Sequence, residues 1–347
     1  MVDRGFGLQL ENDYGEIVAK SAFEPDFWVE ADSVDFKLND EAITKSGTSR
    51  MDKRARAGIM KPTGSTQLDA DMEKLAWFFR LFLDEYKYTA GASSAKVHTH
   101  EFWGGENKEL ASARIKAVYD MLVKYIYGAM EEGLSIEVSD DSVSISNDWI
   151  YSTEKAGIIG SAGETFTRPD ELKENIFLMF YDVSLKLNNK ALDGVSTAFS
   201  YEGKNNFDVD GTIGLGSRYP QKRALAGKRE NTLSITTSLT SDTVRSILDA
   251  EYGEVNALEP SSCKLLQIPL EVNIALCEDA QISCKIIFPK CTLNVEYDMS
   301  GADAIEVTMN LATLGSGEVT LADNSKKTTD MYVKLVNYQT EIAPKGD

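Results

Sequence analysis

The segment VDFKLNDEAI at residues 34–43 recurs in altered form as VSLKLNNKAL at residues 183–192, 149 positions further along the chain. A second segment, KRARAG at 53–58, recurs as KRALAG at 222–227, and Thr63 and Ser65 match Thr232 and Ser234 at that same spacing of 169 positions. Order, spacing and residue types all recur, which indicates duplicated structural units. We therefore predict two copies of one domain, the second with 20 extra residues between its matched segments.

The boundary between the two copies is predicted from composition. The segment AGIIGSAGETFTRPDEL at 156–172 is rich in small and turn-forming residues, as linkers commonly are. We expect a first domain over residues 1–158, a linker over 159–172 and a second domain over 173–347.

The first matched segment predicts a half-buried strand in each copy. Val34, Phe36 and Leu38 alternate with the polar Asp35 and Lys37, which is the period of a strand with one buried face. The turn-forming pairs at 39–40 and 188–189 predict a hairpin directly after that strand.

A helix is expected next in each copy. In the first copy Ser65 and Thr66 offer hydroxyl caps. The apolar residues that follow at helical spacing are Leu68, Met72, Leu75, Ala76, Phe79 and Leu83. In the second copy Thr240, Ser241 and Asp242 precede Val244, Ile247 and Leu248.

The remaining patterns are those of strands. Residues 134–138 and 143–145 predict a strand pair around Asp140 and Asp141, and residues 284–295 and 305–311 alternate in the second copy. The expected fold class is therefore mainly β: two tandem, duplicated antiparallel β-sandwich or barrel domains, each with a flanking α-helix.

Charge and cysteine usage exclude several classes of function. Acids outnumber bases 55 to 36, for a net charge of −19, which argues against an ordinary DNA-binding surface. The 4 Cys contain no CxxC pair, so a thiolate zinc site is unsupported and buried, reduced thiols are expected. No apolar run is long enough for a membrane helix, and the N-terminus carries acids where a signal peptide needs an apolar core. We expect synthesis in a cytoplasm and no membrane partner.

The order of the patterns resembles a known family. A strand, a hairpin, a Lys- and Arg-rich loop, a Thr-x-Ser strand and a Leu/Trp/Phe-rich helix follow one another as in two-domain bacteriophage tail tube proteins. GSTQLDAD at 64–71 with LAWFF at 75–79 is similar to that family's first-domain signature, and GLGSRYP at 214–220 is similar to its second-domain loop. FWGG at 102–105, with Lys108 and Leu110, is similar to an insertion in such members, so the resemblance covers roughly residues 30–315.

The resemblance implies a non-enzymatic, structural virion protein without a cofactor. Its inner strands would join neighbouring subunits into a sheet around the channel through which phage DNA is ejected, and closure would remove exposed sheet edges. Six domains per ring would come from three chains with pseudo-sixfold symmetry, or from six chains whose domains stack along the axis. The implied partners are other copies of the chain, the tape measure protein, tail-end proteins, passing DNA bound without sequence specificity and, in a contractile tail, a sheath. The implied location is the virion, after synthesis in the host cytoplasm.

Two basic loops are the candidate interface between rings. They contain Lys53, Arg54, Arg56, Lys222, Arg223, Lys228 and Arg229. Against an acidic neighbour these side chains would steer ring-to-ring contacts. The alternative is an ordinary solvated surface loop.

Other patterns suggest chemistry only weakly. His98 and His100 would share one face of a strand, as a metal pair requires, but an exposed polar hairpin is favoured because no Cys or third His is near in sequence. Asn206, Asp208, Asp210 and Gly211 imitate the start of a calcium loop, yet Ser217 stands where a bidentate Glu is required. An Asp-Gly turn explains the same residues.

Glycines and carboxylates are equally weak signals. Gly211, Gly214 and Gly216, and likewise Gly157, Gly160 and Gly163, lack the lysine and the βαβ context of a phosphate loop, and flexible loops are favoured. Asp69, Asp71, Asp140 and Asp141 are expected on solvated faces rather than as an acid–base pair.

Two other classes of function stay open. A tandem β-sandwich binding module, such as an adhesin of a virion or cell surface, could stack sugars on Trp28, Trp77, Trp103 or Trp149, although no tryptophan recurs between the copies. A metal-dependent hydrolase is disfavoured because the chain has only 2 His and no coherent ligand set.

Overall fold

The computed structural model describes residues 4–18, 23–45, 51, 54–91, 96–139, 142–160, 177–192, 196–238, 241–253, 256, 259, 266–298 and 306–344. Antiparallel sheets dominate this part of the chain and it holds two α-helices, which confirms the mainly-β prediction. None of its helices has the length and hydropathy needed to cross a membrane.

The first half of the chain contains one helix, which follows the sixth strand. Its elements are β1 (Arg4–Leu10), β2 (Phe27–Val29), β3 (Ser33–Lys37), β4 (Asp40–Lys45), β5 (Arg54–Met60), β6 (Thr63–Asp69), α1 (Met72–Phe82), β7 (Glu85–Thr89), β8 (His98–Trp103), β9 (Ala113–Tyr119), β10 (Leu122–Val138), β11 (Val143–Ile150) and β12 (Thr153–Ile158).

The second half also places a helix after a long strand. Its elements are the 3₁₀ turn η3 (Phe180–Asp182), β13 (Val183–Leu187), β14 (Lys190–Ala191), β15 (Ser196–Lys204), η4 (Asp210–Thr212), β16 (Glu230–Ser238), α2 (Ser241–Tyr252), β17 (Ile268–Ala275), β18 (Ser283–Asp298), β19 (Glu306–Thr313), β20 (Gly317–Thr320), β21 (Lys326–Thr329) and β22 (Tyr332–Asn337).

The predicted strand at 34–38 is present as β3, with Phe36 buried in the core and Val34 and Leu38 packed against it. The hairpin expected at 39–40 is wrong. Asn39 has φ 48°, a left-handed conformation that Asn tolerates, and the chain continues from it into β4. β4 pairs with β5, so the connection between them lies beyond Lys45. The hairpin at 188–189 is confirmed, because β13 pairs with β14 across it.

Helix α1 begins later than its apolar spacing predicts. Ser65, Thr66 and Leu68 lie in β6, and the cap is Asp71, whose Oδ1 accepts the Glu73 amide hydrogen at 2.8 Å. Strand pairing with β11 overrides the helical spacing of those first residues. The predicted helix after 240 is confirmed as α2, and the strand pair predicted around Asp140 and Asp141 is confirmed as β10–β11. The two alternating segments of the second copy are confirmed as strands β18 and β19, which also pair with each other.

The two halves share a pattern of strand pairing. β6 leads into α1 and pairs with β11, which pairs with β10; β16 leads into α2 and pairs with β19, which pairs with β18. Thr63 and Ser65 therefore occupy places like those of Thr232 and Ser234.

The match of 34–43 with 183–192 is wrong as a structural correspondence. β3 lies beside β6, before the first helix, whereas β13 lies beside β17, after the second. By its pairing, β13 resembles β1, which lies beside β9. The domain duplication itself stays a prediction.

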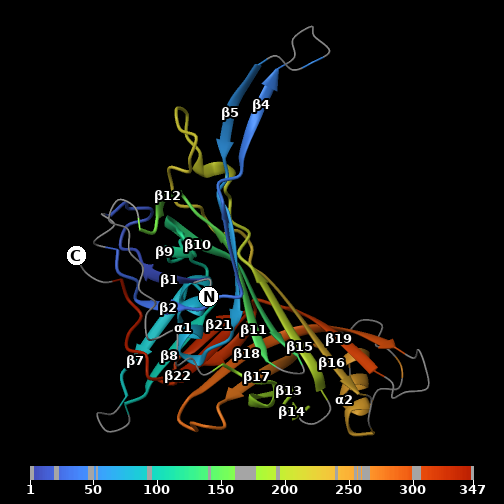
Figure 1. Cartoon of the computed structure of the whole chain (residues 1–347). Helices are drawn as coiled ribbons and strands as arrows, with labels where there is room; N and C mark the ends of the chain where they lie inside the picture. Colours follow the sequence, from blue (N-terminus) through green and yellow to red (C-terminus); the bar gives the residue numbers. More distant parts are fainter. Residues whose placement is uncertain are drawn as a thin grey trace.

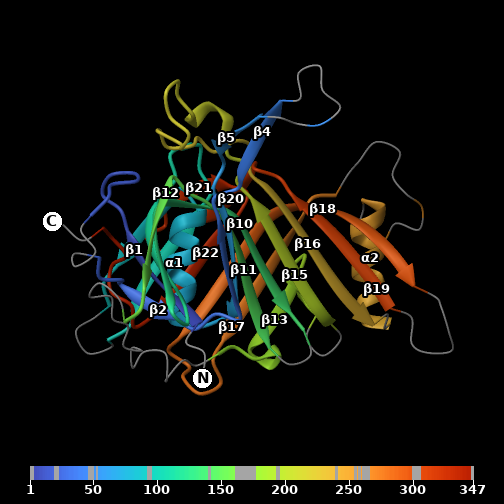
Figure 2. The same cartoon turned by 45° about the horizontal axis from the view of Figure 1, so that its top comes forward.

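The halves are joined through continuous sheet rather than through a narrow linker. β10 pairs with β15, and β8 pairs with β22. One large hydrophobic core includes Phe79 and Leu134 from the first half and Leu270 and Met309 from the second. Figures 1 and 2 show α1 among these strands and α2 at the far end of the molecule. Most of the predicted linker at 159–172 lies outside the described residues.

Candidate functional site

Eight adjacent strands form one continuous part of the sheet. Their order is β3, β6, β11, β10, β15, β16, β19 and β18. Figure 1 shows β11, β15, β16 and β19 side by side. Because strand side chains alternate between faces, one face of this run packs on the core and the other meets solvent.

The solvent face is covered almost entirely by small polar side chains. Strand register places one cross-strand row on Thr292, Ala312, Thr232, Glu202, Ser135, Ser146, Gln67 and Ser33. The neighbouring row is Asn294, Asn310, Ser234, Ser200, Glu137, Ser144 and Asp69. We call this surface the polar face.

The polar face is hollowed over its second-half strands. A depression of about 600 Å³ is lined there by Ser135, Ser200, Thr232, Ser234 and Asn310, among others. The hydroxyl and amide groups of this shallow concavity can hydrogen-bond water, and Leu233, Leu293 and Leu311 also contribute to its lining.

The polar face is also acidic. Its carboxylates are Asp35, Asp69, Glu137, Asp148, Glu202, Glu230, Glu296 and Glu306, and its lysines are Lys37 and Lys204. Both lysines are paired within the face, Lys37 with Asp35 and Lys204 with Glu202 at 2.7 Å. The hydrogen bond that Lys204 donates to Glu202 raises the pKa of Lys204, and burial raises the pKa of Asp148. Paired lysines leave an excess of negative charge.

Two strands bound this sheet, each with one side lacking a strand partner among the described residues. β3 pairs only with β6. Residues 292–298 of β18 pair only with β19. At Phe36 of β3 that side is met by side chains of the same chain: the Phe36 carbonyl oxygen accepts a hydrogen bond from Lys124 Nζ at 2.6 Å, and its backbone amide bonds to the Tyr119 hydroxyl. Such edges are templates for pairing with another chain.

A two-stranded arm projects from one end of the molecule. It consists of β4 and β5, which pair with each other, and Figures 1 and 2 show it extending beyond the rest of the chain. Ile43 is 53% exposed and Ile59 is 52% exposed on it. The arm therefore presents apolar side chains to solvent on two strands, which alone are marginally stable in water.

Most of the predicted basic residues gather at this end. Arg54 and Arg56 are exposed on β5 of the arm. The loop that carries Lys222 and Arg223 packs beside the base of the arm, where Arg218 donates to the Gly58 carbonyl oxygen and pairs with Asp40 at 2.6 Å. Lys228 is exposed in the same loop, and Lys53 lies outside the described residues.

Arg223 has an internal contact as well. Its guanidinium lies 5.7 Å from the centre of the Tyr14 ring.

Arg229 differs from the other basic residues because its side chain is only 11% exposed. It pairs with Asp84 at 2.8 Å and Asp330 at 3.2 Å, and donates to Asn205 Oδ1 at 3.3 Å. Asp84 follows α1 and Asp330 precedes β22, so the cluster ties the two halves together. We exclude Arg229 from the candidate ring-to-ring surface.

An apolar groove of about 560 Å³ lies toward the other end, around β13 and the start of β15. It is lined by Phe180, Val183, Leu185, Leu192 and Phe199, among others. Figures 1 and 2 place β13 at the end opposite the arm. The two ends therefore both carry apolar surface.

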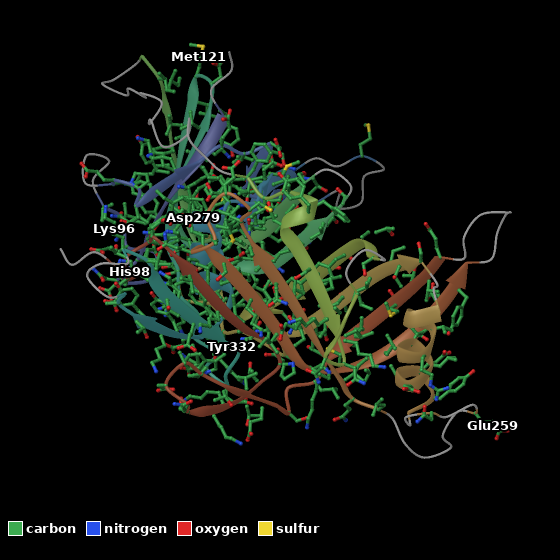
Figure 3. The ribbon with its side chains drawn as sticks, turned by 90° about the horizontal axis from the view of Figure 1, so that it is seen from below. Lys96, His98, Met121, Glu259, Asp279 and Tyr332 are labelled. Carbon is green, nitrogen blue, oxygen red and sulfur yellow. The ribbon has the colours of Figure 1, made fainter. Side chains whose placement is uncertain are left out.

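The histidines form part of an aromatic ladder. His98 Nδ1 lies 2.6 Å from the Tyr88 hydroxyl, and His100, which is fully buried, lies 3.0 Å from the Tyr86 hydroxyl and donates through Nε2 to the Gln339 carbonyl oxygen. Figure 3 shows His98 at the edge of the molecule near Lys96. The exposed-hairpin interpretation is wrong for His100. The described residues contain no group of three or more His, Cys, Asp or Glu side chains that could hold a metal ion.

The loop that imitates a calcium site is a turn closed by its own side chains. Asp208 Oδ1 accepts the Gly211 amide hydrogen at 3.1 Å, Asp210 pairs with Lys61 at 2.5 Å, and Asn206 donates to the Lys228 carbonyl oxygen at 2.8 Å. Gly214 and Gly216 have open space around them, so no phosphate cradle surrounds them. Gly157 lies in β12, Gly160 follows that strand, and Gly163 lies outside the described residues.

The two candidate acid–base carboxylates that the structure describes have separate roles. Asp69 lies on the polar face and Asp71 caps α1. Asp140 and Asp141 lie outside the described residues.

Aromatic and sulfur side chains are mostly internal. Trp77, Trp103 and Trp149 are at most 7% exposed, which leaves them unavailable for sugar stacking. Cys284 and Cys291 are buried free thiols as predicted, whereas Cys277 is exposed.

Sequence reasoning did not identify the polar face, although a signal existed. Ser and Thr alternate with apolar residues in β10, β11, β15 and β16, and only the pairing order brings them together. No family model matches the sequence. No curated protein matches it either.

Proposed function

We propose that the chain is the structural subunit of a tail tube, a closed conduit along which DNA passes out of a virion. The observation that carries the proposal is the eight-stranded sheet, with one acidic polar face and two strand edges left unpaired. A conduit wall requires these properties together: lateral edges that join neighbours and an inner surface that does not retain its cargo.

The unpaired edges support self-assembly. Isolated subunits would expose backbone donors and acceptors along β3 and β18, and pairing with further copies satisfies them. A ring closes only through such heterologous contacts, in which one surface meets a different one.

The arrangement of the halves favours three chains per ring over six. The four strands that each half contributes to the sheet lie side by side, joined at β10 and β15, rather than one above the other. Each chain then supplies two neighbouring positions of a pseudo-sixfold ring.

The charge of the polar face supports its assignment to the channel. Phosphates of a passing duplex are repelled by the excess carboxylates, over roughly 8 Å at physiological salt. Repulsion keeps DNA mobile, and the described strands of this face carry no arginine that could bind a base or a phosphate.

The arm and its basic neighbours support stacking of rings. Arg54 and Arg56 extend from one end with the exposed isoleucines, and the apolar groove lies toward the other end. Contact between these unlike ends propagates a tube along its axis, with the basic side chains steering the approach.

Electron microscopy of the purified protein tests the proposal. We expect rings or tubes with a central channel, whose frequency rises with protein concentration. Monodisperse monomers at every concentration would contradict it and would favour the binding-module alternative.

A further inference from the structure

We propose that β18 of one copy pairs antiparallel with β3 of the next copy in one defined register, with Glu296 directly opposite Lys37. This inference rests on the proposed function, because it names the contact through which the subunits of a ring join.

The chain already contains one junction of this kind. Where the halves meet, β10 pairs with β15, with Leu134 opposite Gly203 and Ile136 opposite Tyr201. β18 corresponds to β10: each is a long strand whose first part pairs with the preceding strand (β17 or β9) and whose second part pairs with the following strand (β19 or β11). β3 corresponds to β15, since each pairs with the strand that leads into a helix.

The chain therefore contains one complete strand junction, β10 with β15, and two strands, β18 and β3, that correspond to the two sides of such a junction but do not pair with each other. The second part of β10 is covered by β15, but the same part of β18 has no strand on that side among the described residues. β3 likewise has one side without a strand partner in the part of the chain that the structure describes. A second copy supplies the missing partner to each edge.

The register follows from the helix starts. α1 and α2 begin 169 positions apart, at Met72 and Ser241, and the strands before them end 169 positions apart. Thr66 of β6 thus corresponds to Ile235 of β16.

The pairings then carry this correspondence across each half. Thr66 lies opposite Val34 of β3, and through Asn147 the row reaches Leu134 of β10. The equivalent row starts at Ile235, which lies opposite Phe199 of β15 and, through Met309, reaches Val295 of β18. Val34 therefore matches Phe199, and Leu134 matches Val295.

The internal junction now fixes the external one. Leu134 lies opposite Gly203, four residues after Phe199, so Val295 lies opposite the residue four after Val34, which is Leu38. One step along the antiparallel ladder places Glu296 opposite Lys37, and another places Tyr297 opposite Phe36.

Irregularities in the ladders agree with this alignment. Register shifts lie between Ile126 and Ala129 in β10 and between Phe288 and Cys291 in β18, 162 positions apart in both cases. β10 has a further register shift between Glu131 and Gly133, which adds one residue to β10. The spacing between corresponding residues of β10 and β18 therefore falls from 162 to the 161 positions that separate Leu134 from Val295.

The side chains at the proposed seam suit it. On the core side, Tyr297 is 41% exposed and Val295 and Leu38 are half-buried, whereas Leu134, Ile136 and Tyr201 at the internal junction are at most 2% exposed. On the polar face, the register places Glu296 opposite Lys37, a favourable pairing of opposite charges, and at the next pair on this face it places Asp298 opposite Asp35, a pairing of like charges.

Disulfide trapping in assembled tubes tests the register. With Cys263 and Cys277 replaced by Ser, the pair Lys37→Cys with Glu296→Cys places the two Cα atoms about 4.5–5.5 Å apart, within disulfide reach. We expect intermolecular cross-links on mild oxidation, with a covalent ladder on non-reducing gels that stops at three chains.

The matched control pairs Lys37→Cys with Thr292→Cys. Thr292 lies on the same face of β18 four residues away, about 13 Å along the strand, so no cross-link is expected. Cross-links to position 292 instead of 296, or to neither in tubes seen by electron microscopy, would overturn the inference and leave the proposed function standing. Absence of rings and tubes from the parent protein would refute the proposed function itself.

Discussion

At the scale of single residues, Glu131 is a carboxylic acid placed where water does not reach. Glu131 is 0% exposed. Asn147 Nδ2 donates a hydrogen bond to its Oε1, and its Oε2 has no hydrogen-bond partner among the described residues. Burial raises the pKa of Glu131 well above its usual 4.5. The folded protein therefore keeps this side chain protonated at a pH where the unfolded chain has lost the proton.

This difference predicts that Glu131 makes the fold less stable as pH rises. Below pH 4.5 the side chain is protonated in both states and contributes no pH dependence. Above it, the unfolded state releases its proton first, so the free energy of unfolding falls by about 1.4 kcal/mol per pH unit until the folded-state pKa is reached. Glu131→Gln removes that slope, and we expect it to raise the urea midpoint at pH 8 relative to the parent protein, with little change at pH 4.

The exposed Glu106→Gln is the control for the same loss of one carboxylate. The urea midpoint of Glu106→Gln is expected to change between pH 4 and pH 8 by the same amount as that of the parent protein. Equal pH profiles for Glu131→Gln and the parent protein would show that Glu131 is ionised in the fold.

Arg229 illustrates what a local sequence cannot reveal about a residue. It resembles Arg54 and Arg56 as a basic residue in a loop, and sequence alone groups all three. Its partners Asp84 and Asp330 lie 145 and 101 positions away, so only the fold identifies it as an internal ion pair. The burial of such a side chain depends on its distant partners, which its own neighbours in sequence do not encode.

At the scale of elements, the proposed stacking of rings rests on the arm, whose two strands carry the exposed Ile43 and Ile59. We predict that Ile43→Asp combined with Ile59→Asp leaves rings intact but prevents their stacking. Losing the burial of two isoleucines weakens each contact between rings by several kcal/mol. Because about 1.4 kcal/mol corresponds to a tenfold change in affinity, the protein concentration needed for tubes rises by well over tenfold. Sedimentation velocity and electron microscopy distinguish single rings from tubes.

Ile17→Asp is the matched control for the arm variant. Ile17 is 51% exposed but lies outside the arm, so this variant is expected to form tubes normally. Normal tubes from the arm variant would remove the arm from the stacking contact.

The elements also show how far sequence patterns reach. The alternation of apolar and polar residues located β3, β11 and β19 correctly. Each of these strands has one buried face, and a strand with one buried face produces that alternation. Helical spacing misplaced the start of α1, since β6 happens to carry Leu68 in phase with the helix that follows.

The repeat was more difficult to align. The KLN motif recurs in β3 and β13 because both strands precede an Asn in the left-handed conformation, Asn39 and Asn188. Similar local geometry thus produced similar letters at places that differ in strand pairing. The polar face was not found because its rows join residues from eight strands, and register is a property of the whole sheet.

At the scale of the whole molecule, the acidic polar face becomes the wall of the channel if rings form as proposed. We predict that tubes of the parent protein do not retain DNA, whereas tubes carrying Glu137→Lys, Glu202→Lys and Glu306→Lys do. These exposed residues lie on three different strands of the polar face, so their reversal places ammonium groups along the wall. Each new phosphate contact steepens the fall of log K with log salt by about 0.9, so retention at 50 mM salt should be lost by 200 mM.

The position of the charge matters here more than its total. Glu106→Lys, Glu109→Lys and Glu278→Lys change the net charge of the chain by the same amount from exposed sites away from the polar face. If the polar face lines the channel, short labelled duplexes should elute from the tubes of this control in a filter-binding assay, as from the parent protein, and stay with the polar-face variant. Equal retention by the two variants would mean that the polar face does not meet the DNA, and the channel would then have to be lined by another surface of the molecule.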